Sequence, residues 1–248
     1  MARINLTRDG LNLVGEREEP FGKIYNMALI MHEITADKNR PLLREIADHL
    51  RDENVASVRF DFNGHGESDG AFKDMTVPSA ISDARTFLDY VRTDPHVRDI
   101  YLIGHSMGGV VASMLAGMYP DIVKKLVLLA PAAVLRDDAI NGQVQGNEFN
   151  PHRIPDTLLL HGQELGGFYL RSARHLPIYE TAADFTGPVN IIQGTNDQVV
   201  PQKYAEKYEQ IYANSKLHLI KNADHRFSDA YQDQAVKLTS DFLKPSFY

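Results

Sequence analysis

Short apolar runs alternate with longer amphipathic segments along most of this chain, and this alternation constrains the fold more than any other feature. The runs are four to eight residues long and lie at residues 27–31, 55–62, 100–103, 126–130, 189–192 and 217–220. Apolar runs of this length are typical of strands that are buried on both faces of a sheet. Helical patterns lie between them, at residues 41–51, 77–91, 107–119, 202–212 and 229–243. The alternation therefore predicts an α/β fold with a mostly parallel central sheet and helices on both faces.

Two regions depart from this rhythm. The first twenty residues predict a β-hairpin with its turn at Asp9-Gly10. Residues 131–185 contain no clear strand–helix unit and are rich in Asn, Gln, Gly and His. An unstructured loop of that length is improbable in a compact domain, and insertions at the carboxyl edge of a parallel sheet lie where ligands bind. We therefore predict a core made of residues 1–130 and 186–248, with residues 131–185 inserted as a lid.

Composition excludes several classes of function. The 248 residues include no cysteine, which excludes a thiol nucleophile, a disulfide framework and thiolate metal sites. The net charge is −7 and no basic run stands out, so nucleic acid is not an expected partner. The N-terminus has no continuous apolar segment of a signal peptide, and the apolar runs are too short to span a bilayer. A cytoplasmic protein without a membrane partner is the expectation.

Two stretches resemble ligand sites but lack residues that those sites require. His32-Glu33 could begin a zinc-protease helix, but the second histidine four positions later is absent because position 36 is Ala36. The glycine-rich residues 63–70, "NGHGESDG", lack the Lys-Ser/Thr of a phosphate-binding loop. We expect them to form a tight turn, with Asp61 and Ser68 bonding its backbone. No metal ion or organic cofactor is predicted.

The strongest chemical signal is Gly104-His105-Ser106-Met107-Gly108, which matches the G-x-S-x-G motif. It follows a predicted strand and precedes a predicted helix, which is the context that the motif needs. A tight strand-to-helix turn strains the serine backbone, and glycines on either side avoid collisions with neighbouring elements. The motif predicts that Ser106 is a nucleophile; the alternative is that it only caps the helix. His105 is expected to pack inside the turn.

A serine hydroxyl needs a base to take its proton, and in this context an acid and then a histidine follow in later loops. Asp197 lies just past the run at residues 189–192, and His225 just past the run at residues 217–220. Ser106, Asp197 and His225 therefore form the predicted triad, with His225 as general base and Asp197 fixing its tautomer. Asp224 is a competing candidate for the acid, although an adjacent side chain rarely reaches its neighbour's ring nitrogen.

The stretches "RFDFNGHGESDG", "GHSMGG", "LLAPAA", "GTNDQVV" and "ADHRFSD" resemble those of the α/β-hydrolase fold. With "LGGFYL" and "LPIYE" in the insertion, the chain resembles bacterial cinnamoyl (feruloyl) esterases from Ala2 to Leu243. The resemblance implies hydrolysis of hydroxycinnamate esters without a cofactor, and it makes a homodimer plausible. It also points to Asp138, Gln145 and Tyr169 in the lid as groups that hold the phenolic end of the substrate.

The same resemblance assigns the oxyanion hole to the backbone N–H groups of Ile34 and Met107. Glu33 departs from the family, which usually has glycine at that position. Two interpretations stay open: the Glu33 side chain turns toward solvent without effect, or its carboxylate or a backbone shift weakens the oxyanion hole. His32 is expected to be structural rather than a second base.

Within the enzyme class, the alternatives are a short-chain acyl esterase, a thioesterase or a peptidase, because one triad serves all of them. A binding protein that has lost catalysis is a further alternative, although such proteins usually break the triad. The native ester, the oligomeric state and lid movement are not readable from the sequence.

Overall fold

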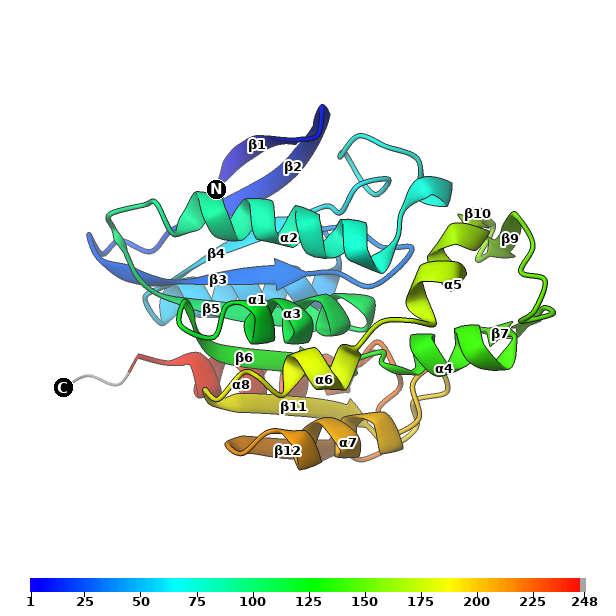
Figure 1. Cartoon of the computed structure of the whole chain (residues 1–248). Helices are drawn as coiled ribbons and strands as arrows, with labels where there is room; N and C mark the ends of the chain where they lie inside the picture. The colour runs from blue at the N-terminus through cyan, green and yellow to red at the C-terminus, as the bar shows by residue number, and fades with distance from the viewer. Residues whose placement is uncertain (246–248) are drawn as a thin grey trace.

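The computed structural model describes residues 1–245 and is built around one eight-stranded sheet (Figure 1). Its strands in chain order are β1 (Ala2–Arg8), β2 (Leu11–Glu18), β3 (Tyr25–Met31), β4 (Val55–Phe60), β5 (Val97–His105), β6 (Val123–Leu129), β11 (Val189–Gly194) and β12 (Ser215–Ile220). The spatial order is β1-β2-β4-β3-β5-β6-β11-β12. The pairs β1–β2 and β2–β4 are antiparallel, and every pair from β4 to β12 is parallel. The predicted hairpin and the mostly parallel sheet are confirmed.

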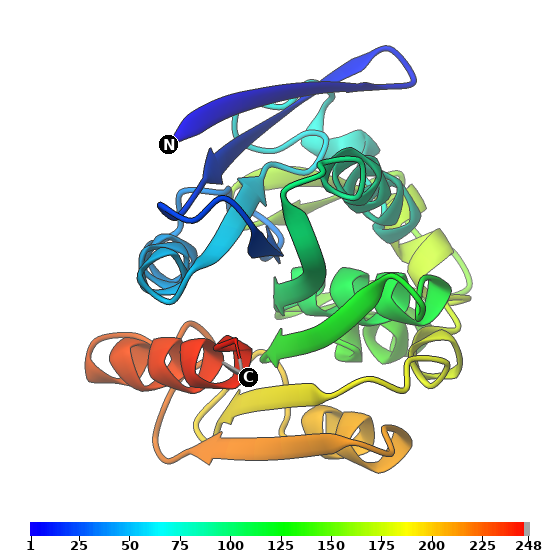
Figure 2. The same cartoon turned by 90° about the vertical axis from the view of Figure 1, so that its left-hand side faces the viewer.

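Helices cover both faces of the sheet. On one face lie α1 (Pro41–Asp52) and α8 (Ala230–Leu243), and on the other lie α2 (Val77–Val91), α3 (Met107–Met118) and α7 (Lys203–Ile211) (Figure 2). Within residues 1–245, no helix is both long and apolar enough to cross a bilayer.

Strand β3 shows why a short apolar run predicts a strand that is buried on both faces. Its alternate residues Met27, Leu29 and Met31 belong to one hydrophobic core cluster, and Ala28 and Ile30 belong to the other. Successive side chains of a strand point to opposite faces, so a strand between two helical layers is apolar on both faces along most of its length.

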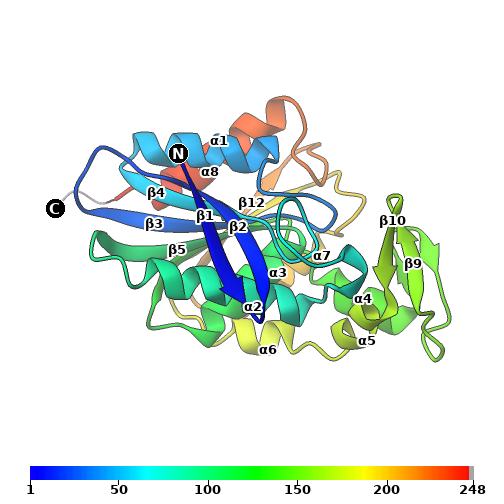
Figure 3. The ribbon, with the colours of Figure 1, turned by 90° about the horizontal axis from the view of Figure 1, so that it is seen from above.

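Most of the predicted insertion, from α4 to α5, lies beyond the carboxyl ends of the parallel strands, whereas α6 lies beside α3 (Figures 1 and 3). It contains α4 (Val134–Asn141), β7 (Gln143–Val144), β8 (Asn147–Glu148), β9 (Thr157–Leu160), β10 (Gln163–Gly166), α5 (Gly167–Ala173) and α6 (Ile178–Ala182). The strands form two small antiparallel hairpins, β7–β8 and β9–β10. The last helix, α6, packs so closely on α3 that a Cβ atom at Gly117 would lie 1.8 Å from the carbonyl oxygen of Thr181.

The turn that follows β4 is held by side chains of its own loop. The backbone N–H of Glu67 donates to Oδ2 of Asp61 at 2.9 Å, and the Ser68 hydroxyl donates to the Asp61 carbonyl at 2.7 Å. The expected roles of Asp61 and Ser68 in this turn are confirmed. Lys38 adds a buried ion pair, with Nζ 2.7 Å from Oδ2 of Asp61.

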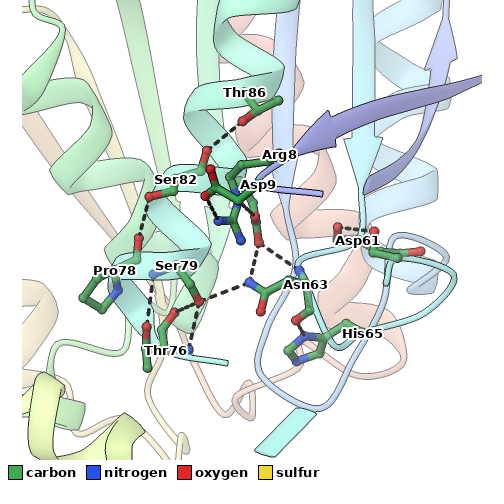
Figure 4. A network of polar contacts seen from close by, with 12 residues as sticks. Arg8, Asp9, Asp61, Asn63, His65, Thr76, Pro78, Ser79, Ser82 and Thr86 are labelled. Carbon is green, nitrogen blue, oxygen red and sulfur yellow. Dashed lines mark hydrogen bonds and ion pairs between the residues drawn. The ribbon is translucent and has the colours of Figure 1, made fainter. Parts of the chain in front are cut away.

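A second network ties this loop to α2 (Figure 4). Asn63 donates to Oδ2 of Asp83 from its backbone N–H at 2.8 Å and from Nδ2 at 2.6 Å. Arg8 lies 2.5 Å from the other oxygen of Asp83. Thr76 and Ser79 form a capping box that starts α2. The loop between β4 and α2 is therefore fixed against both the hairpin and the helix.

Candidate active site

The sharp turn between β5 and α3 places Ser106 at the carboxyl edge of the sheet. Its backbone has φ 57° and ψ −119°, a strained conformation for a residue other than glycine. A Cβ at Gly104 would lie 2.1 Å from the carbonyl oxygen of Gly108, and one at Gly108 would lie 2.4 Å from that of Met31. The two glycines are therefore required by close backbone contacts, as expected from the motif.

Ser106, His225 and Asp197 are brought together by three loops that are far apart in the sequence. Nε2 of His225 lies 2.9 Å from Oγ of Ser106, and Nδ1 of His225 lies 2.8 Å from Oδ2 of Asp197. Asp197 follows β11 and His225 follows β12. With Nδ1–H donating to the carboxylate, Nε2 is free to accept the serine proton, which is the tautomer that a general base needs.

The carboxylate of Asp197 is held by several donors besides the imidazole. The N–H groups of Val199 and Val200 each donate to Oδ1 at 2.8 Å. Burial opposes ionisation, but the hydrogen bonds from His225 and from these backbone groups keep the pKa of Asp197 below its ordinary value. Gln193, in β11, donates from Nε2 to Oδ2 at 2.9 Å and was not anticipated from the sequence. Its one sequence signal is that it is a polar residue, like Asn190, in a strand that is otherwise without polar side chains.

The competing acid, Asp224, has other partners. Its carboxylate accepts from the backbone N–H of Ser228 at 2.8 Å and from the Ser228 hydroxyl at 2.7 Å. These bonds stabilise the turn before α8, and Nδ1 of His225 is already occupied by Asp197.

Ile34 and Met107 line the same small cavity as Ser106. Met107 is the first residue of α3, so its N–H has no partner within the helix. Among residues 1–245, no hydrogen bond is formed by the backbone N–H of Ile34 or of Met107. Two free N–H groups beside a serine hydroxyl suit the oxygen of a tetrahedral intermediate.

The idea that Glu33 turns toward solvent is wrong. The residue is only 3% exposed, and its carboxylate contacts three basic side chains. Oε2 lies 2.6 Å from Nδ1 of His105, and Oε1 lies 2.7 Å from Arg40 and 3.2 Å from Arg226. Burial opposes ionisation, but the charges of His105, Arg40 and Arg226 hold the pKa of Glu33 well below its ordinary value. The Glu33 side chain is therefore buried because it pairs with three basic side chains, and the local sequence around Glu33 does not indicate these partners.

His32 supports the loop that carries Ile34. Its ring accepts at Nε2 from the backbone N–H of Phe62 at 3.1 Å and donates from Nδ1 to the Glu33 carbonyl at 2.7 Å. Burial, with a contribution from His65, lowers the pKa of His32 to about 3, so the ring is neutral at pH 7. His32 therefore holds the backbone of Glu33 and Phe62 in place, and both of its ring nitrogens are occupied by these contacts.

On the side of residues 131–185, Ser106 lines a narrow cavity of about 30 Å³ together with all three residues of this segment singled out above, Asp138, Gln145 and Tyr169. Its walls are otherwise mainly apolar and include Val134, Leu135, Val144 and Val199. Burial and the neighbouring Asp137 raise the pKa of Asp138 to about 6. Burial likewise raises the pKa of Tyr169, so its phenol is neutral at pH 7.

On the other side, Ser106 faces a larger and more open pocket with polar walls. Thr35, His161, Asn196, Gln198 and Arg226 contribute to this surface. Gln145 borders both cavities and accepts a hydrogen bond from Nε2 of His161 at 2.6 Å. The nucleophile thus lies between an enclosed, mainly apolar slot and an open polar mouth.

Comparisons with known proteins agree with this arrangement. The sequence matches the family described as "Serine aminopeptidase, S33" over residues 41–176, which is more than half of the chain. Est1E from Butyrivibrio proteoclasticus, in a structure with ferulic acid bound, superposes with a TM-score of 0.94 at 30% identity and covers 97% of each chain. The similarity to feruloyl esterases that the sequence motifs indicate is therefore confirmed.

Curated relatives are more distant. The human serine hydrolase BPHL is 24% identical over 203 residues, which is 75% of this chain and 69% of BPHL. Protein phosphatase methylesterase 1 of Candida albicans is 36% identical over 85 residues, and the match spans only 23% of that protein. The chain belongs to the serine aminopeptidase S33 family, and it is a serine hydrolase with the α/β-hydrolase fold.

Proposed function

We propose that this serine hydrolase is a carboxylesterase that releases hydroxycinnamic acids from their esters. In this proposal Ser106 is the nucleophile, His225 the general base and acid, and Asp197 the group that orients and stabilises the imidazole. The N–H groups of Ile34 and Met107 form the oxyanion hole. The 2.9 Å contact between Ser106 and His225 and the 2.8 Å contact between His225 and Asp197 support these roles.

The reaction proceeds through an acyl-enzyme. Oγ of Ser106 attacks the ester carbonyl carbon while Nε2 of His225 takes the hydroxyl proton, and the carbonyl oxygen becomes an oxyanion that the two N–H groups stabilise. Collapse of this intermediate breaks the bond to the alcohol, which leaves with the proton from His225. A water molecule then loses a proton to His225 and attacks the acyl carbon, and release of the acid restores Ser106.

The side chains around the narrow cavity are the observation that carries the substrate assignment. At about 30 Å³ the cavity must widen before an aromatic acyl group can enter. An aromatic acyl group needs apolar walls, and a ring hydroxyl needs a polar partner at the far end. Val134, Leu135 and Val144 provide apolar walls, while Asp138 and Tyr169 provide the polar groups. The open mouth with polar walls suits the alcohol, so we expect tolerance of different alcohols. Est1E, which binds ferulic acid in its structure, supports the same choice of acyl group.

The test compares substrates on one enzyme preparation. We expect kcat/KM for methyl ferulate to equal or exceed that for p-nitrophenyl butyrate, and Ser106→Ala to abolish both activities. Tyr169→Phe should impair methyl ferulate more than p-nitrophenyl butyrate, while Phe168→Ala, at a side chain that is 64% exposed, serves as the matched control. Rapid turnover of the butyrate without turnover of the ferulate would assign a short-chain esterase instead. Preference for an acyl thioester would assign a thioesterase, and preference for an aminoacyl amide would assign a peptidase. Failure of a fluorophosphonate to label Ser106 would favour a binding protein.

A further inference from the structure

Behind the proposed triad, Glu33 and His105 form a second carboxylate–imidazole pair. Both residues are buried, and the ring of His105 lies beside that of His225 with centroids 5.2 Å apart. Nε2 of His105 lies 2.9 Å from the backbone carbonyl oxygen of His225. We propose that Glu33 and His105 position the catalytic imidazole by holding the backbone of His225. The inference rests on the triad roles proposed above and is independent of the acyl group that the enzyme prefers.

The partners of His105 determine its protonation. A carbonyl oxygen accepts only, so Nε2 must carry a proton to bond the carbonyl of His225. Nδ1 lies 2.6 Å from Oε2 of Glu33, so the buried carboxylate lies against the other nitrogen of the ring. The ring of His105 is therefore held between the Glu33 carboxylate and the backbone carbonyl of His225.

A second contact reinforces this hold on the loop of His225. Glu33 also contacts the side chain of Arg226, the residue next to His225, at 3.2 Å. The loop after β12 is thus attached at two successive residues, through His225 to the strand–helix turn and through Arg226 to the loop after β3. His105 also directly precedes the nucleophile in sequence.

Small displacements of the imidazole matter because its ring must reach Ser106 and Asp197 at once. A misplacement of about 1 Å can reduce a rate by about 100-fold. Substrate binding needs no such alignment with His225. A positioning role therefore predicts a loss in kcat with little change in KM.

The first arm of the test is spectroscopic. In protein labelled with nitrogen-15 at histidine, long-range proton–nitrogen correlation should show a ring whose Nε2 is protonated and hydrogen-bonded, and this signal should be absent in His105→Phe. In Glu33→Gln the signal should shift, because the ring loses the carboxylate beside Nδ1. A His105 ring without a proton on Nε2 in the unmodified protein would overturn the proposal.

The second arm is kinetic and uses p-nitrophenyl acetate, so that it does not depend on hydroxycinnamate recognition. We expect kcat to fall about 10- to 100-fold in His105→Phe and about 3- to 10-fold in Glu33→Gln, with KM within about twofold in both. Glu45→Gln removes a part-buried carboxylate of α1 that bonds Gln232 and serves as the matched control. Circular dichroism and thermal unfolding establish that each variant is folded.

Unchanged kcat in a folded His105→Phe variant would also overturn the proposal. Failure of the proposed function has a different signature, namely no turnover of methyl ferulate, or p-nitrophenyl acetate hydrolysis that survives Ser106→Ala. Neither of those results alters the spectroscopic arm.

Discussion

Nε2 of Gln193 donates a hydrogen bond to Oδ2 of Asp197, the same oxygen that lies 2.8 Å from Nδ1 of His225. The amide shares its remaining donor capacity between the carbonyl oxygens of Gly194 and Val200. Gln193 is fully buried, so this contact is shielded from water. The carboxylate that orients His225 is therefore itself oriented by a side chain of the sheet.

Replacing Gln193 by Met removes this bond while keeping a similar volume. We expect kcat to fall about tenfold, equivalent to about 1.4 kcal/mol, because a hydrogen bond to a charged group contributes about that much or more. KM should change little, since Gln193 does not line either cavity. Steady-state kinetics on p-nitrophenyl acetate measure the effect, with Gln202→Met, at an amide that bonds Glu206, as control. Equal losses in the two variants would show that Asp197 does not depend on Gln193.

The ionisation of Asp138 predicts a pH-dependent affinity. Its pKa is raised to about 6, first by burial and then by Asp137. Above pH 6 the ionised carboxylate accepts a hydrogen bond from a phenol, so KM for methyl ferulate should fall several-fold between pH 5 and pH 7. Methyl cinnamate has no ring hydroxyl and should show no such fall. The pH dependence should vanish in Asp138→Asn; if it persists there, another group is responsible.

The raised pKa of Asp138 also affects the stability of the folded protein. Because the folded-state pKa of Asp138 is above the ordinary value of 3.8, the folded protein binds more protons between pH 4 and pH 6. The contribution of this group therefore favours folding at low pH and is lost as the pH rises through about 6. Asp138→Asn should raise the free energy of unfolding relative to the parent protein, and this gain should be larger at pH 7 than at pH 4. Urea unfolding at the two values measures the difference, and an equal difference at both would contradict it.

The buried pair of Lys38 and Asp61 supports the loops around the site. The Asp61 carboxylate accepts from the Lys38 backbone N–H and from Nζ, each at 2.7 Å, and both side chains are almost fully buried. Lys38→Met leaves a buried carboxylate without its counter-ion and should lower the free energy of unfolding by about 3–5 kcal/mol. Lys237→Met breaks an exposed pair with Asp241 and should change it by less than about 1 kcal/mol. Comparable losses in the two variants would show that burial does not determine how much an ion pair contributes to the free energy of unfolding.

The glycine at the end of β5 gives a steric prediction. Gly104→Ala would place a Cβ 2.1 Å from the Gly108 carbonyl, so the strand–helix turn must shift and the variant should lose activity and stability together. Gly162→Ala meets no atom within 4 Å, although φ is +83°, and should cost about 1–2 kcal/mol without loss of activity. Thermal unfolding and fluorophosphonate labelling distinguish the two. An active, stable Gly104→Ala variant would refute the close-contact argument.

The sequence predicts most of the core because local pattern and tertiary environment agree there. Strand β3 is apolar at every position except Asn26 because helices cover both faces, and the G-x-S-x-G motif carries its own steric requirement. The order of nucleophile, acid and histidine then follows from the positions of β11 and β12.

The rest depended on contacts that no local pattern encodes. The hairpins β7–β8 and β9–β10 have strands of two and four residues, too short to show an alternation. The position of Glu33 follows from basic side chains on three other segments, which overcome the general preference of a carboxylate for water. The contact of Gln193 with Asp197 likewise requires the loop after β11 to fold back on its strand.

Asp138, Gln145 and Tyr169 all come from one uninterrupted stretch between β6 and β11, whereas Ser106, Asp197 and His225 come from outside it. In the roles proposed here, the residues that select the acyl group and the residues that cleave the ester bond therefore lie in separate segments of the sequence. Substitutions within residues 131–185 can then change the acyl specificity of such an enzyme while its catalytic triad stays the same.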